Sequence, residues 1–220
     1  MKKLILLLVV FTFISCDKDS IVNSLDDIGI SSSVTAKQSA DDVLLEARID
    51  YSSDAQLAGI YGWNVDRNGR VDLLSPTSNA FVYIVQSDIK QENEFYVPVY
   101  LAGPVKSPIN FSTMLSFVKD DATKDKMNDV FGLLASQGID PSANYVDSPS
   151  ALNSVLSVAE ASSFLAANTS AKIDMILVPS KTIDILQGIV DSADWIVHIY
   201  TDSESKVFWL NSGTGIVTRF

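Results

Sequence analysis

The only cysteine of this chain, Cys16, closes an apolar N-terminal segment, and this position limits what the remainder can fold into. Two lysines follow Met1, an apolar run extends from Leu4 to Ile14, and a serine precedes the cysteine. A basic start, a short apolar core and a small residue are typical of a secretory signal, and the run is shorter than the roughly 20 residues that span a bilayer. We therefore expect residues 1–15 to be a targeting segment and the exported part to fold around an apolar core without disulfide bonds.

The residues Phe13-Ile14-Ser15-Cys16 resemble the lipobox of bacterial lipoproteins. This resemblance implies that Cys16 is diacylated, that the signal is cut before it, and that the new amino group is acylated. Several acyl chains on one residue hold a protein firmly to a membrane. The acidic start of the next segment, Asp17–Ser20, resembles sorting signals of some Gram-negative lipoproteins. The expected location is therefore the outer membrane, with the periplasmic or the cell-surface face left open; an ordinary secretory signal is the alternative.

The charge balance excludes one class of partner. The chain has 16 Lys and Arg against 27 Asp and Glu, a net charge of −11, and removal of the two N-terminal lysines leaves 14 − 27 = −13. Phosphate groups repel such a protein, so we expect no nucleic-acid partner. Anionic lipid head groups repel it as well, which leaves the N-terminal lipid as the membrane attachment.

After the signal, the composition divides the chain into four parts. Residues 16–38, rich in Ser and Asp, are expected to be the lipidated cysteine and a flexible tether. A first α+β unit at 39–103, a helical connection at 104–149 and a second α+β unit at 150–220 follow. Periodicity and turn residues predict one helix that begins at Ser39 and three more at 112–117, 124–137 and 150–168. The predicted strands are 56–63, 71–74, 80–86, 94–101, 173–178, 183–188 (or a short helix), 195–201, 207–210 and 216–220.

These elements predict an α+β fold in which helices pack on an antiparallel sheet. A helix, a strand and an aromatic hairpin occur in the same order in both halves, so two tandem units, or one domain built from them, are expected. The residues Trp195–Thr201, Lys206–Asn211 and Thr214–Val217 resemble the closing hairpin of PepSY-type domains, and 54–69 resembles the opening of a related unit. This resemblance implies a non-catalytic module linked to peptidase inhibition or protein binding outside the cytoplasm.

Two patterns suggest chemistry and are outweighed by simpler interpretations. His198 is the only histidine; with no thiolate or second histidine in the exported part, a zinc site is not expected, and we expect a strand histidine that faces water. Asn64, Asp66 and Asn68, followed by Gly69, resemble the first half of a calcium loop. The pattern has Ser75 where a bidentate Glu belongs, so a turn is the preferred interpretation and calcium the weaker one.

Trp63, Trp195 and Trp209 are candidates for a ligand-binding face, although aromatic side chains on strands more often belong to the core. No Gly-x-Ser-x-Gly motif is present, and we expect no enzyme and no cofactor. The sequence thus favours a membrane-anchored lipoprotein that binds or modulates a protein, such as a peptidase, within an envelope assembly. The alternative is a surface lipoprotein that binds a glycan or a small ligand.

Overall fold

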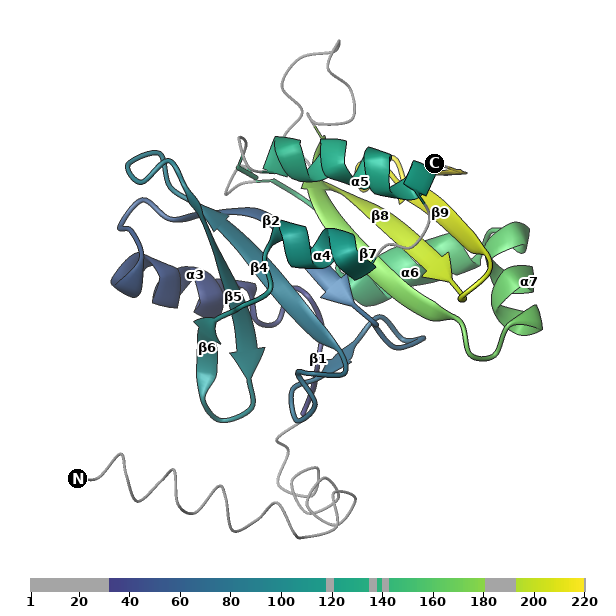
Figure 1. The fold of residues 1–220 in the computed structure, drawn as a ribbon, viewed down its shortest axis with the longest axis horizontal. Coiled ribbons are helices and arrows are strands. Elements are labelled where there is room, and N and C mark those ends of the chain that lie inside the picture. Colours follow the sequence, from purple (N-terminus) through teal and green to yellow (C-terminus); the bar gives the residue numbers. More distant parts are fainter. Residues whose placement is uncertain (1–31, 118–120, 135–137, 140–142, 181–192, 220) are drawn as a thin grey trace, which may run out of the picture. The chain divides into compact units, whose positions relative to one another are not determined.

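The centre of the fold is an eight-stranded sheet in the order β10-β9-β8-β7-β2-β4-β5-β6, in which every paired neighbour is antiparallel (Figure 1). The computed structural model describes residues 32–117, 121–134, 138–139, 143–180 and 193–219. The predicted signal, Cys16, most of the predicted tether and the element expected at 183–188 lie outside these residues. The strands are β2 (Gln56–Trp63), β4 (Ala80–Gln86), β5 (Asn93–Val99), β6 (Gly103–Lys106), β7 (Lys172–Pro179), β8 (Ala193–Tyr200), β9 (Ser205–Leu210) and β10 (Val217–Arg219).

Helices cover both faces of this sheet, so the predicted α+β class is confirmed (Figure 1). One face packs against α3 (Ala40–Asp50), α6 (Ser148–Leu156) and α7 (Ala159–Ala167), and we call it the α6 face. The other, the α5 face, packs against α4 (Phe111–Phe117) and α5 (Asp121–Leu134). Alternate residues of a strand point to opposite faces, so strands covered on both sides, such as β4, are apolar almost throughout.

The central pair, β2 and β7, joins two meanders of four strands each. The first runs through β2, β4, β5 and β6, the second through β7, β8, β9 and β10, and each follows a helix of the α6 face. The predicted order of helix, strand and hairpin therefore occurs twice in the chain. Both meanders lie in a single continuous sheet, and Ser33–Phe220 form one compact unit.

Several element predictions need correction. The helix expected at 150–168 is two helices, because Val158 between them is in extended backbone and caps α7. The break lets both helices place apolar side chains on the sheet, which one straight helix of that length would not do. Pro104, at the start of the helical connection expected at 104–149, belongs to strand β6. Residues 71–72 form β3, which pairs with β1 (Ser33–Val34) in a separate two-stranded sheet.

The start of the folded unit also differs from expectation. Ser39 precedes α3, but its side chain makes no capping hydrogen bond. Residues 33–38, assigned to the tether, are part of the folded unit, since β1 pairs with β3 and Ala36 is fully buried. The hydroxyl of Tyr83 donates to the Ala36 carbonyl at 2.6 Å, which fixes this segment on the α6 face.

Ser148 ties three distant segments together at the start of α6. Its hydroxyl accepts from the buried Ala36 N–H at 3.0 Å and donates to the Gly69 carbonyl at 2.7 Å. Gly69 has a φ of +75°, and a Cβ there would lie 2.6 Å from Pro149 Cα, so this close approach requires glycine. The turn predicted at 66–69 thereby becomes the support for α6.

We expect Ser148→Ala to lower the free energy of unfolding by about 2 kcal/mol, because a buried N–H and a buried carbonyl each lose their partner. Urea unfolding at neutral pH measures this change. Ser150→Ala, on the exposed side of the same helix, is the matched control and should change stability by less than about 0.5 kcal/mol. Equal stabilities of the two variants would contradict this role of Ser148.

Candidate functional site

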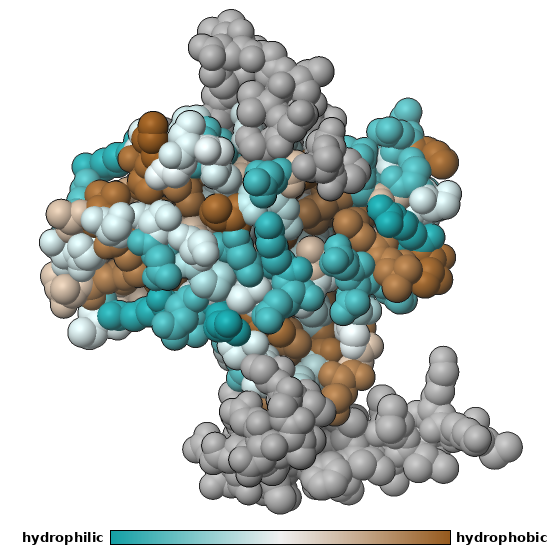
Figure 2. All heavy atoms as spheres, turned by 180° about the vertical axis from the view of Figure 1, so that it is seen from behind, coloured by the Kyte–Doolittle hydropathy of each residue, from teal (hydrophilic) through white to brown (hydrophobic). Residues whose placement is uncertain are grey.

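Exposed apolar side chains gather at one end of the sheet. Of the six large apolar residues that are exposed in the described part of the chain, only Ile216 lies elsewhere. The other five lie on α3, the β4–β5 loop and the β5–β6 hairpin, which we call the α3–β6 end: Leu45, Ile49, Ile89, Leu101 and Val105. Figure 2 shows the face that carries α3, with apolar surface at its right-hand side over this helix.

Leu45 and Ile49 are the most regular part of this surface. They are 61% and 73% exposed and lie one helical turn apart on α3, so they share one side of the helix. The opposite side is anchored by Val43 and Ala47, which are fully buried. Ile49 therefore lies outside the buried side of α3.

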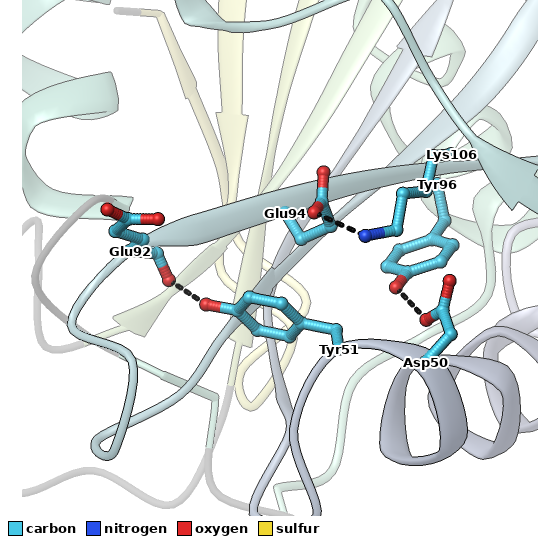
Figure 3. A network of polar contacts seen from close by, with 6 residues as sticks. All are labelled: Asp50, Tyr51, Glu92, Glu94, Tyr96 and Lys106. Atoms are coloured by element: carbon cyan, nitrogen blue, oxygen red, sulfur yellow. Dashed lines mark hydrogen bonds and ion pairs between the residues drawn. The ribbon is translucent and has the colours of Figure 1, made fainter.

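Polar contacts hold the α3–β6 end in place (Figure 3). At the end of α3, the carboxylate of Asp50 accepts from the hydroxyl of Tyr96 on β5. The hydroxyl of Tyr51 donates to the Glu92 carbonyl in the β4–β5 loop. An ion pair of 2.9 Å joins Lys106 on the edge strand to a glutamate of β5. These contacts bind helix, loop and hairpin to one another, so the exposed apolar residues sit on a rigid base.

The β4–β5 loop has its own support, in Asp54. This carboxylate accepts from the hydroxyls of Ser52 and Ser87 and from the Ile89 N–H. Hydrogen bonds from the two serines lower the pKa of Asp54 to about 2, against the smaller opposing effect of desolvation. The carboxylate is therefore charged at neutral pH, and it fixes the start of the loop, including Ile89.

The edge of the sheet at this end is poorly suited to accept a further strand. Pro98 of β5 faces Pro104 of β6, and neither has an N–H, so this pair is of the kind that exchanges no hydrogen bonds. The backbone of Pro104 and Lys106 consequently points away from the sheet, and only Lys106 can donate there. A proline and a lysine on an edge strand are typical protections against strand addition. A protein partner at this end would therefore contact side chains and would not pair with the backbone of the edge strand.

The three tryptophans do not form one face. Trp195 is fully buried on the α6 face, and its indole N–H donates to the Val146 carbonyl at 2.8 Å. Trp63 and Trp209 lie on the α5 face and are partly exposed, and the indole of Trp209 donates to Asp194 at 3.1 Å. Trp195 thus has the role of a core residue, and a row of three exposed indoles is not present.

The residues considered as calcium ligands make hydrogen bonds that stabilise local backbone structure. The carboxylate of Asp66 accepts from the N–H groups of Asn68 and Arg70 at 2.8 Å each, which is a turn stabilised by its own side chain. Asn64 has a φ of +50°, and its amide donates to the Ser78 carbonyl. In the part of the chain that the structure describes, no group of three or more His, Cys, Asp or Glu is arranged to hold a metal ion.

His198 was expected to face water, and this expectation is wrong. It is 8% exposed on β8, on the α5 face of the sheet, directly opposite Asp174 of β7. Its ring stacks on that of Tyr200, with centroids 4.5 Å apart and planes 16° from parallel. A cavity of about 260 Å³ adjoins the two rings and is bounded by the β8–β9 hairpin, 201–205.

Asp174 is a buried carboxyl group that sequence reasoning missed. It is 3% exposed and accepts from the Asn64 N–H at 2.8 Å and from the hydroxyl of Tyr61 at 2.9 Å, and Tyr200 adds a further hydrogen bond. Burial raises the pKa of Asp174 from 3.8 to about 6, and these hydrogen bonds oppose the change. Its one sequence signal was an acidic residue inside the apolar strand predicted at 173–178.

Comparisons with known proteins found no match of this chain to a family model, to a curated protein or to a solved structure. Among the helices of the described residues, none combines the length and the apolar character needed to cross a membrane.

Proposed function

We propose that this protein is an exported lipoprotein, attached through Cys16 to the outer membrane, that binds an envelope protein without catalysing a reaction. The surface that we assign to this partner is the α3–β6 end. The observation that supports the assignment is the concentration of exposed apolar side chains there, on elements braced by the contacts of Asp50, Tyr51 and Lys106. Exposed apolar groups on a rigid base are typical of protein interaction sites.

The charges around the apolar residues define the chemistry of the partner. Helix α3 carries the acidic residues Asp41, Asp42, Glu46 and Asp50 and a single basic residue, Arg48, so its net charge is 1 − 4 = −3. Two copies of this helix would repel each other, which disfavours self-association through it. The complementary partner has an apolar centre bordered by Lys or Arg side chains.

The two units of similar order suggest how such a module arose. A PepSY-like origin of the two meanders is our proposal for their similarity, and modulation of a peptidase is the specific form of protein binding that it implies. The apolar, acid-bordered α3–β6 end is built from α3 and the first meander. On this proposal the second unit supports the first through the β2–β7 pair.

A charge-insertion variant tests the partner surface. We expect the double change Leu45→Asp and Ile49→Asp to abolish recovery of the partner with the full-length, membrane-anchored protein, because two carboxylates would be desolvated in the interface. Quantitative mass spectrometry of co-purified proteins measures this. The matched control is Asn153→Asp with Ser163→Asp, which adds the same charge to exposed positions of α6 and α7. Partners retained at wild-type levels by the first variant would contradict the assignment.

The anchor is tested separately. We expect a palmitate analogue supplied to growing cells to label the wild-type protein and not Cys16→Ser, because the thioether-linked lipid requires the cysteine sulfur. The wild-type protein should fractionate with membranes, and the variant should leave them. An unlabelled wild-type protein, or a variant that remains in the membrane fraction, would show that the proposed attachment is incorrect.

A further inference from the structure

The cavity beside His198 and Tyr200 is independent of the proposed partner surface. It lies at the end of β8, on the α5 face, whereas the α3–β6 end is built from elements at the other edge of the sheet. Its volume of about 260 Å³ is just below the roughly 300–1,000 Å³ of sites for drug-sized ligands, so it suits a ligand the size of one sugar ring.

One wall of the cavity is a preorganised aromatic pair. Tyr200 and His198 stack on each other, and the hydroxyl of Tyr200 is tied to the buried Asp174. Asp174 in turn is held by Tyr61 and by the Asn64 N–H, so the orientation of the tyrosine ring is fixed before any ligand arrives. A rigid ring loses little entropy when an apolar face of a ligand packs on it.

The other wall is the β8–β9 hairpin, whose backbone is fixed by Thr201. The hydroxyl of Thr201 accepts from the N–H groups of Ser203 and Glu204, and its own N–H donates to the Glu204 carbonyl at 2.8 Å. This arrangement places Asp202, Ser203, Glu204 and Ser205 in the lining of the cavity. Residues with carboxylate and hydroxyl oxygens thus line the cavity together with the aromatic pair.

The lining selects among ligand classes. It contains no Lys or Arg, and its two carboxylates repel anions. In the described residues the acidic groups do not converge as a bound metal ion would require. Several acceptor groups and an aromatic ring in one lining suit a ligand that carries both hydroxyl donors and C–H groups. We propose that this cavity binds one neutral sugar ring, with Tyr200 against its C–H face and Asp202 and Glu204 accepting from its hydroxyls.

Saturation-transfer NMR on the full-length protein, in micelles of a detergent without a sugar head group, tests this proposal. The probes are methyl glucoside, methyl galactoside and N-acetylglucosamine, with putrescine and glucuronate as charged comparators. We expect at least one neutral sugar to bind in the millimolar range, with ring protons saturated most strongly on the face that meets Tyr200, and no binding of glucuronate. Saturation of putrescine alone, or of none of the sugars, would overturn the proposal.

Variants then place the bound sugar. Glu204→Gln, on the hairpin, should weaken binding at least fivefold, whereas Glu92→Gln, in the exposed β4–β5 loop, is the matched control and should leave it unchanged. Tyr200→Leu should abolish binding; because this change also affects Asp174, its far-ultraviolet circular dichroism is compared with that of the wild type. Wild-type affinity in Glu204→Gln would show that the sugar binds elsewhere and would refute the assignment.

Discussion

We expect Trp195→Ala to lower the free energy of unfolding by about 3–5 kcal/mol, one of the largest effects that a single substitution in this protein can have. Trp195 is fully buried between β8 and the helices of the α6 face, where it is paired with Leu177 of β7 and Leu210 of β9. Removal of the indole leaves a cavity and also leaves the Val146 carbonyl without its donor. Urea unfolding followed by circular dichroism measures the loss.

Trp195→Phe separates the two contributions. The phenyl ring retains most of the packing but has no N–H, so we expect a smaller loss of about 1–3 kcal/mol from the unsatisfied carbonyl and the reduced volume. Trp209, which is partly exposed, provides the comparison: Trp209→Ala should cost less than Trp195→Ala. A Trp195→Ala protein of wild-type stability would contradict the assignment of this residue to the core.

The second large effect is that Asp174 makes the free energy of unfolding depend on pH. Its pKa is about 6 in the folded protein and 3.8 in the reference state, so the folded protein binds the proton more tightly. This contribution to stability is fully present below pH 3.8 and is lost as the pH rises through 6. At 1.36 kcal/mol for each pKa unit, the whole effect is about 3 kcal/mol, of which about 2 kcal/mol falls between pH 4.5 and 7.

Asp174→Asn isolates this contribution. The amide does not ionise, and its oxygen can still accept from the Asn64 N–H, so we expect the variant to lack the loss of stability between pH 4.5 and 7. The measurement is the free energy of unfolding of both proteins across that range. The effect of Asp54 has the opposite sign and occurs at lower pH. Because its pKa is lowered to about 2 in the folded protein, its contribution to stability is present at neutral pH and is lost only as the pH falls below 3.8. An identical pH response in both proteins would contradict the buried state of Asp174.

The strands were predicted well where both faces are covered. The bounds of β2 and β4 agree with the predicted 56–63 and 80–86, because each is a near-continuous apolar run that ends at turn residues. The pairing of β2 with β7 was not predictable, since the two strands are more than 100 residues apart in the chain and local patterns carry no information on partners. The placement of both meanders in one sheet follows from that pairing.

The candidate sites were harder to predict because they depend on orientation. On a helix of 3.6 residues per turn, Ile49 is about 240° around the axis from Val43, so burial of Val43 directs Ile49 to the solvent. His198 and Asp174 were on correctly predicted strands, but their proximity depends on the register between β7 and β8. The cavity beside them depends on the same register and on the hairpin that Thr201 fixes.

The assignment of the α3–β6 end to a partner is tested most directly by a photo-crosslinking amino acid at position 49 in the full-length protein, in the cells that produce it. We predict that irradiation gives a covalent adduct with one envelope protein from position 49 and none from position 153, which is also exposed, on α6. The adduct should disappear when Leu45→Asp is added. Adducts of equal yield from both positions, or none from position 49, would contradict the account.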